Sequence, residues 1–128
     1  MSLKNAPVCA VLPAEDIERA KKFWTEKIGL TLDKEVAGGD VVFSAGEGTK
    51  IYMYERARTK AEHTVAAFLV DDLLKTMEEL RSRGVKFEEY DFPGLKTVNG
   101  VAEYEGGKGA WFTDPEGNIV ALNEMSKD

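Results

Sequence analysis

Apolar residues recur at helical spacing in two stretches of this chain, and each stretch is framed by a start and a stop signal. The first runs from Asp16 to Gly29 and the second from Asp72 to Gly84. An Asp before an apolar periodic run is a typical helix N-cap, and a Gly after it is a typical end. The pattern predicts helices over residues 16–28 and 72–83. The apolar positions behind this prediction are Ile17, Ala20, Phe23, Trp24 and Ile28 in the first stretch and Leu73, Leu74, Met77 and Leu80 in the second.

Strand-like segments surround both predicted helices. A short apolar run precedes each helix, at residues 8–12 and 65–70, and reads as a strand that enters the helix. Glycine-rich turns and the Asp114-Pro115-Glu116-Gly117 turn separate the segments that follow. These further predicted strands cover residues 31–36, 40–44 and 50–54 after the first helix, and 86–92, a stretch near 101–104, 109–112 and 118–123 after the second.

The order of elements is therefore β-α-β-β-β, repeated once. Aligning Asp16 with Asp72 places Gly29 against Gly84 with a slip of one residue, so the repeat is one of pattern rather than of identity. The polar stretch 55–62 is the natural connection between the halves. We expect one α+β domain over residues 1–128, with module one at about 6–55 and module two at about 63–125.

Composition narrows the class of protein. The chain has 128 residues, of which 43% are hydrophobic and 31% charged, and its formal charge is −6. No apolar run nears the roughly 20 residues that cross a bilayer, and the first residues lack the apolar core of a signal peptide, so we expect a cytoplasmic protein without a membrane partner. A net negative chain repels phosphate backbones, which argues against nucleic acid. A single cysteine rules out an intrachain disulfide.

Three blocks of the sequence resemble one known family. They are Leu12–Trp24 closing with Ile28-Gly29-Leu30, Phe68–Leu73 running to Arg83-Gly84-Val85, and Trp111–Asn118 followed by Ile119–Leu122. In this order they are similar to glyoxalase/bleomycin-resistance proteins and extradiol dioxygenases, the vicinal-oxygen-chelate superfamily. The resemblance implies two βαβββ modules whose curled mixed sheets surround a concave cavity, with the helices outside.

The resemblance also implies where a metal would bind, because enzymes of this family hold one divalent ion by four side chains. Carried over through the flanking blocks, the four positions are Cys9, Tyr52, Val65 and Ala121. Valine and alanine offer no donor atom, a protonated phenol is a poor ligand, and one cysteine alone does not hold a metal. We expect neither a metal nor another cofactor. His63, the only histidine, lies two residues before Val65, and we favour an exposed linker position for it over a place in the cavity.

The same positions indicate a largely apolar pocket with a few polar groups, which is typical of small-ligand sites. The apolar neighbours of Cys9 predict a buried, unreactive thiol, and Val11 and Ile119 are expected to fill the core. For Tyr52 and Tyr54, a place in the pocket and a place in the core are equally favoured. The residues proposed to contact a ligand are Cys9, Tyr52, Tyr54, His63, Val65, Trp111, Ala121 and Asn123.

Three functions fit this pattern. The first, which we favour, is a metal-free protein that binds an apolar or aromatic small molecule, as bleomycin-resistance proteins bind their antibiotic. The second is a lyase, isomerase or dioxygenase of the same superfamily, with a displaced metal site or none. The third is an interaction module whose cavity has filled and whose dimer surface is the working part. In each case we expect a homodimer, because a single βαβββ half leaves a sheet edge and an apolar face to be covered.

Overall fold

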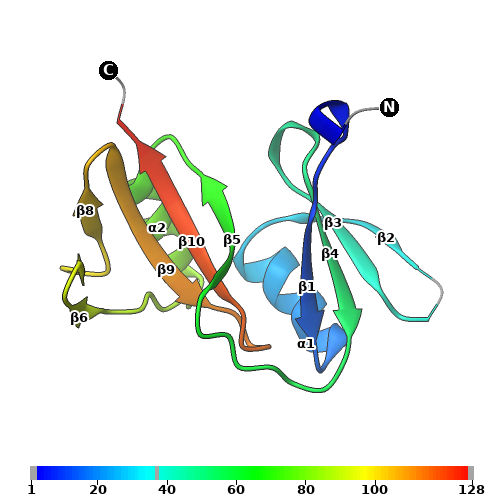
Figure 1. Cartoon of the computed structure of the whole chain (residues 1–128). Helices are drawn as coiled ribbons and strands as arrows, with labels where there is room; N and C mark the ends of the chain where they lie inside the picture. The colour runs from blue at the N-terminus through cyan, green and yellow to red at the C-terminus, as the bar shows by residue number, and fades with distance from the viewer. Residues whose placement is uncertain (1–2, 37, 127–128) are drawn as a thin grey trace. The chain divides into compact units, whose positions relative to one another are not determined.

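The chain divides into two units, each with its own sheet and helix (Figure 1). The structure is a computed structural model that describes residues 3–36 and 38–126. Unit 1 covers residues 1–59 and unit 2 covers residues 60–128. The division falls within the polar stretch 55–62 that the sequence assigned to the connection between modules.

Unit 1 is a βαβββ module with a mixed sheet in the order β1-β4-β3-β2. β1 pairs with β4 in parallel, while β4 with β3 and β3 with β2 are antiparallel. The elements are η1 (Leu3–Asn5), β1 (Ala10–Ala14), α1 (Ile17–Lys22), the π-helical turn η2 (Phe23–Lys27), β2 (Thr31–Glu35), β3 (Val41–Ser44), η3 (Gly46–Gly48) and β4 (Lys50–Glu55).

Unit 2 repeats the arrangement with the strand order β5-β10-β9-β8. β5 pairs with β10 in parallel, and the other neighbours are antiparallel. The elements are β5 (Thr64–Leu69), α2 (Leu73–Ser82), β6 (Asp91–Phe92), β7 (Leu95–Lys96), β8 (Ala102–Tyr104), β9 (Gly107–Thr113) and β10 (Ile119–Met125). The expected α+β class with two βαβββ modules is confirmed.

Both helices begin and end as the sequence indicates. Oδ1 of Asp16 accepts a hydrogen bond from the backbone N–H of Arg19 at 3.0 Å, and Oδ1 of Asp72 accepts one from the N–H of Lys75 at 3.1 Å. After Lys22, however, the first helix widens into η2, whose last turn closes with a bond from the N–H of Ile28 to the carbonyl of Phe23 at 3.1 Å. The helical spacing of the sequence does not distinguish an α-turn from a π-turn.

The strand predicted over residues 86–92 is wrong. Only Phe87 pairs with β9, through Phe112, and the N–H of Glu88 reaches the carbonyl of Trp111 at 2.8 Å. Beyond this point the N–H of Tyr90 donates to the hydroxyl of Thr97 at 2.8 Å. The chain therefore turns into a separate β6-β7 hairpin (Figure 1), because a local side-chain acceptor takes the hydrogen bond that a continued ladder would need.

Each sheet has one face covered by the helix of its own unit. We call the opposite face helix-free, because none of the described helices of the same unit packs on it. Alternation along β4 sends Ile51 and Met53 into the core, where Trp24 also stacks on Phe43 with ring centroids 6.4 Å apart. In unit 2, α2 lies behind β9 and β10 in Figure 1, and Glu124 on β10 accepts a hydrogen bond from the N–H of Leu73, the first residue of α2, at 2.7 Å. Residues of the opposite parity therefore lie on the helix-free faces.

Among the described residues, no helix is long and apolar enough to cross a membrane.

Candidate functional site

The helix-free face of unit 1 presents a tyrosine–aspartate pair. Tyr52 and Tyr54 share this face of β4, and both are half-buried. The hydroxyl of Tyr52 donates a hydrogen bond to Oδ2 of Asp40 at 3.0 Å. This bond, together with partial desolvation and the charge of the carboxylate, raises the pKa of Tyr52.

A second polar group lies on the same face. Nζ of Lys50 donates to Oγ of Ser44 at 3.0 Å and pairs with Oδ2 of Asp33 at 3.3 Å. Lys50 precedes Tyr52 by two residues on β4, so both side chains project from one side of the sheet. This face is consequently more polar than the sequence indicated. Asp40 was not among the residues proposed from the sequence. It lies two residues before Val42, so alternation puts the two on one face, but only the pairing of Val42 with Tyr52 brings Asp40 near the phenol.

Two expectations for the first strand are wrong. Cys9 was expected to be buried and is exposed, and Val11 was expected in the core and is 55% exposed. Pairing of β1 with β4 begins at Ala10, which leaves Cys9 outside the sheet. Leu12 and Ala14 enter the core instead, because the strand presents that parity to its helix. The apolar run alone does not fix which parity faces inward.

The positions predicted at the start of unit 2 lie at the edge of its sheet. His63 is exposed and precedes the first residue of β5, so it has no fixed place on a strand face. This agrees with the exposed position favoured from the sequence. Val65 is half-buried and falls where the register between β5 and β10 shifts.

Trp111 dominates the helix-free face of unit 2. Its Nε1 donates to Oγ1 of Thr64 at 3.2 Å, and Thr64 belongs to β5, which is separated from β9 by β10. The indole therefore reaches across β10, where its register partner is Ala121. Ala121 is only 3% exposed, so it lies beneath the ring and offers little accessible surface to a ligand. Ile119, expected in the core, is half-buried on the same face.

An aromatic cluster extends from this indole. The ring of Tyr90 meets Trp111 edge-on with centroids 5.6 Å apart, and Phe92 meets Tyr90 at 5.7 Å. Burial, followed by the nearby charge of Glu88, raises the pKa of the Tyr90 phenol. The sequence did not single out Tyr90, because it lies in the segment wrongly assigned to a regular strand.

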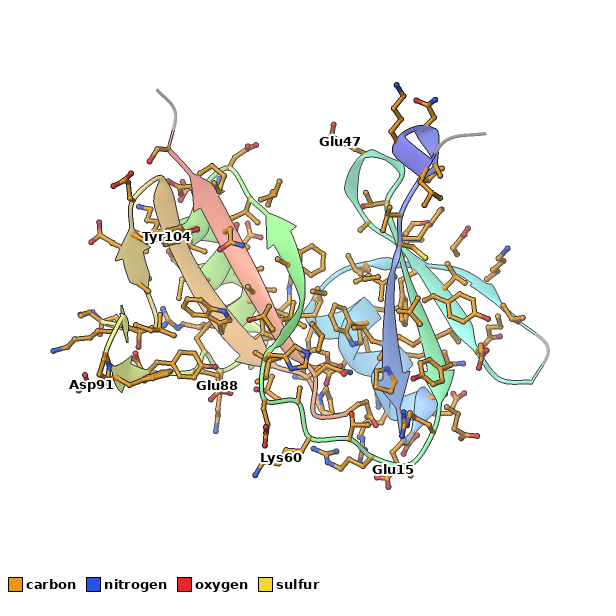
Figure 2. The ribbon with its side chains drawn as sticks, viewed as in Figure 1. Glu15, Glu47, Lys60, Glu88, Asp91 and Tyr104 are labelled. Atoms are coloured by element: carbon orange, nitrogen blue, oxygen red, sulfur yellow. The ribbon has the colours of Figure 1, made fainter. Side chains whose placement is uncertain are left out.

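A polar pair borders the other side of the indole. The hydroxyl of Tyr104, labelled in Figure 2, donates to Oδ1 of Asn123 at 3.1 Å. Asn123 is the register partner of Gly109 on β9. A Cβ at Gly109 would lie 2.8 Å from Oδ1 of Asn123 and 3.8 Å from Cη2 of Trp111. The amide and the edge of the indole therefore both border the space that a side chain at this position would fill.

Comparison with known proteins places this arrangement in a family. The sequence profile of the Glyoxalase/Bleomycin resistance protein/Dioxygenase superfamily matches residues 7–122. The chain belongs to this superfamily. The resemblance stated from the three sequence blocks is thereby confirmed.

Relatives of this superfamily member include one curated protein and many solved structures. YetH of Bacillus subtilis (strain 168), an uncharacterized protein, is 30% identical over 118 residues, which cover 86% of this chain and 90% of its own. TnmS3, an antibiotic binding protein from Streptomyces sp. CB03234, has a TM-score of 0.72 at 23% identity and covers 95% of this chain and 98% of its own. The fosfomycin resistance protein FosX from Listeria monocytogenes has a TM-score of 0.70 at 15% identity, over 95% of this chain and 92% of its own. At these identities the two structures establish a common fold.

The metal site implied by the superfamily does not fit these residues. The four carried-over positions supply an exposed thiol, a phenol that donates a hydrogen bond to Asp40, and two alkyl side chains. Divalent ions in proteins take carboxylate, imidazole or thiolate ligands in convergent sets. Within residues 3–36 and 38–126, no three His, Cys, Asp or Glu side chains converge in such a set.

Proposed function

We propose that this member of the superfamily binds a flat, apolar or aromatic small molecule without a metal ion. The observation that carries the proposal is that the indole of Trp111 is held in one orientation while part of it stays exposed. Its indole is held at one end by the hydroxyl of Thr64 and edge-on by Tyr90, yet it stays half-exposed on the helix-free face of unit 2.

A tryptophan fixed in this way is a suitable platform for stacking. An aromatic ligand that stacks on an indole gains about 0.5–1.5 kcal/mol beyond the burial of its apolar area. Little side-chain entropy is lost on binding, because the ring already has two partners. Exposed apolar surface nearby extends the platform, since Leu69 on β5 is 77% exposed and Phe92 is 49% exposed.

The relatives support binding rather than identify a ligand. TnmS3 is described as an antibiotic binding protein, and FosX as a fosfomycin resistance protein. Both share the fold of this chain, so the fold accommodates organic molecules of more than one kind. Because fold alone does not determine function, the proposal rests on the aromatic face described above.

An enzyme of the same superfamily is the second candidate, and one observation favours it. Asp40 places a carboxylate beside Tyr52, one of the positions where a metal ligand is expected. A lyase, isomerase or dioxygenase that used this group would need further ligands. Saturable metal binding would distinguish this candidate from the first.

Two measurements test the binding proposal. Native mass spectrometry of protein purified without chelators should detect a retained organic molecule. Calorimetric titration with 2-ethylnaphthalene, a flat apolar probe, should give saturable binding that Trp111→Ala weakens by about tenfold or more, the equivalent of roughly 1.4 kcal/mol.

Leu74→Ala is the matched control, because it removes an exposed apolar side chain from α2, 56% exposed, on the other side of the sheet. This variant should bind the probe as the original chain does. Equal weakening by both substitutions, or no effect of Trp111→Ala, would contradict the proposal.

A further inference from the structure

The polar pair beside the indole offers a fixed hydrogen-bond donor. The hydroxyl of Tyr104 has two acceptors in reach, Oδ1 of Asn123 at 3.1 Å and the carbonyl of Lys108 at 3.5 Å. A phenol has one proton, and the nearer acceptor receives it. This bond uses one of the two lone pairs of Oδ1 and turns Nδ2 away from the phenol, so Nδ2 is the group of the amide that is left without a partner in the described part of the chain.

The amide is held in this orientation from two sides. Tyr104 on β8 fixes its oxygen, and the absence of a side chain at Gly109 on β9 provides the space in which it lies. Among the described residues, none accepts a hydrogen bond from Nδ2, and Asn123 is only half-buried. A donor that is already oriented loses little entropy when it binds an acceptor.

The charge of unit 2 restricts what that acceptor can be. Unit 2 contains 14 of the 23 acidic residues and 8 of the 17 basic ones, so it carries the entire formal charge of −6, and unit 1 is neutral. A negative field disfavours an anionic ligand. A neutral carbonyl oxygen accepts the same hydrogen bond without this repulsion.

We infer that Asn123 determines specificity, by donating a hydrogen bond from Nδ2 to a neutral carbonyl oxygen on the edge of an aromatic ligand stacked on Trp111. Tyr104 is the positioning residue, since it acts on the ligand only through the amide. The inference rests on the proposed function and narrows its ligand to aromatic ketones, amides and related neutral carbonyl compounds.

Three probes of nearly equal shape separate the contributions. 2-Acetylnaphthalene carries the carbonyl, 2-ethylnaphthalene replaces it with an alkyl group, and 2-naphthoate replaces it with an anion. The ketone should bind about threefold to tenfold more tightly than the hydrocarbon, as one neutral hydrogen bond allows. The anion should bind more weakly than the ketone, and raising the salt concentration should reduce this difference.

Nuclear magnetic resonance adds a readout that a purely structural role would not affect. The side-chain NH₂ signals of Asn123 should move when 2-acetylnaphthalene is added and move less with 2-ethylnaphthalene. The indole N–H signal of Trp111 should respond to both probes. The indole of Trp24, which is fully buried, should respond to neither.

Substitutions then assign the selectivity. Asn123→Leu and Tyr104→Phe should each bring the ratio of ketone to hydrocarbon affinity close to one. Thr113→Val is the control, because it removes a hydroxyl from the same sheet face at about 13 Å along the strands from Asn123. It should keep the ratio of the original chain.

The possible outcomes separate this inference from the proposed function. Equal affinity for 2-acetylnaphthalene and 2-ethylnaphthalene would overturn the inference and leave the binding function in place. So would a ratio of ketone to hydrocarbon affinity that Asn123→Leu does not change. A preference for 2-naphthoate over the ketone would also overturn it. Absence of binding by all three probes would overturn the inference and the proposed function together.

Discussion

The phenol of Tyr52 on β4 donates a hydrogen bond to Oδ2 of Asp40, which lies one residue before β3, at 3.0 Å. The bond needs the protonated phenol, so the pKa of Tyr52 rises above its ordinary value of about 10. Asp40→Asn removes the negative charge and weakens the acceptor. The pKa of Tyr52 should then fall toward the ordinary value. Ultraviolet titration of the phenolate measures this, with Tyr52→Phe subtracted to isolate the signal from the other tyrosines.

The same pair gives stability a dependence on alkaline pH. Because the pKa of Tyr52 is higher in the folded chain than in the unfolded one, its contribution is fully present below about pH 10 and is lost as the pH rises through the folded value. Asp40→Asn should therefore reduce the loss of stability above pH 10. An unchanged alkaline unfolding curve would contradict the assigned hydrogen bond.

Metal addition provides the next test. A ligand that binds only the native state raises the melting temperature, in proportion to its concentration relative to its dissociation constant. Zinc, nickel, iron and manganese should leave the melting temperature essentially unchanged, because the positions of Cys9, Tyr52, Val65 and Ala121 do not form a donor set. A saturable rise at stoichiometric metal, abolished by Asp40→Asn, would support the enzyme candidate instead.

The fold was more predictable from the sequence than the direction in which each strand face points. The helix signals at Asp16 and Asp72 are local, and hydrogen bonds to the third residue beyond each Asp confirm them. Strand parity is not local, since it depends on which side the helix packs. For that reason the apolar run at residues 8–12 indicated a strand correctly, but the burial of Val11 was predicted wrongly.

The candidate site was predicted in part for a similar reason. Trp111 was named from the last hairpin and Asn123 from its alternation with Ala121 on the last strand. The structure brings both to the space above Gly109. Tyr104 and Tyr90 reach that neighbourhood only through tertiary contacts. Tyr104 on β8 hydrogen-bonds Asn123 on β10, across β9, and the ring of Tyr90, in an irregular segment, contacts Trp111. No spacing rule in a single sequence encodes such contacts.

Assembly into a homodimer is a further prediction. β1 and β5 are edge strands of their sheets, and each carries an exposed apolar side chain, Val11 at 55% and Leu69 at 77%. Edge strands with exposed apolar residues favour association with another chain, and most homo-oligomers are two-fold dimers. Light scattering at micromolar concentration should give about twice the 14.2 kDa of one chain. A monomeric mass across that range would contradict the prediction.

Two glycines of β9, Gly107 and Gly109, differ in what an added side chain would meet. A Cβ at Gly107 would lie 2.3 Å from the backbone carbonyl oxygen of Glu124, whereas a Cβ at Gly109 meets first the side-chain oxygen of Asn123, at 2.8 Å. Backbone atoms of a paired strand cannot move aside without loss of ladder bonds, but an amide side chain can rotate. Gly107→Ala should therefore lower the free energy of unfolding by about 2 kcal/mol, within the usual cost of overpacking.

Gly109→Ala should change the free energy of unfolding by less than about 1 kcal/mol. The preference of a strand for alanine over glycine stabilises the variant, and the strain of the close contact with Asn123 destabilises it by a similar amount. Urea denaturation measures both variants side by side. The displaced amide of Asn123 should lose its bond to Tyr104, so Gly109→Ala should also lose the preference for 2-acetylnaphthalene over 2-ethylnaphthalene while still folding. If Gly109→Ala keeps that preference, the amide is not oriented by the space above Gly109. If Gly107→Ala is as stable as the original chain, the strands separate there at little cost and the contrast between the two positions is wrong.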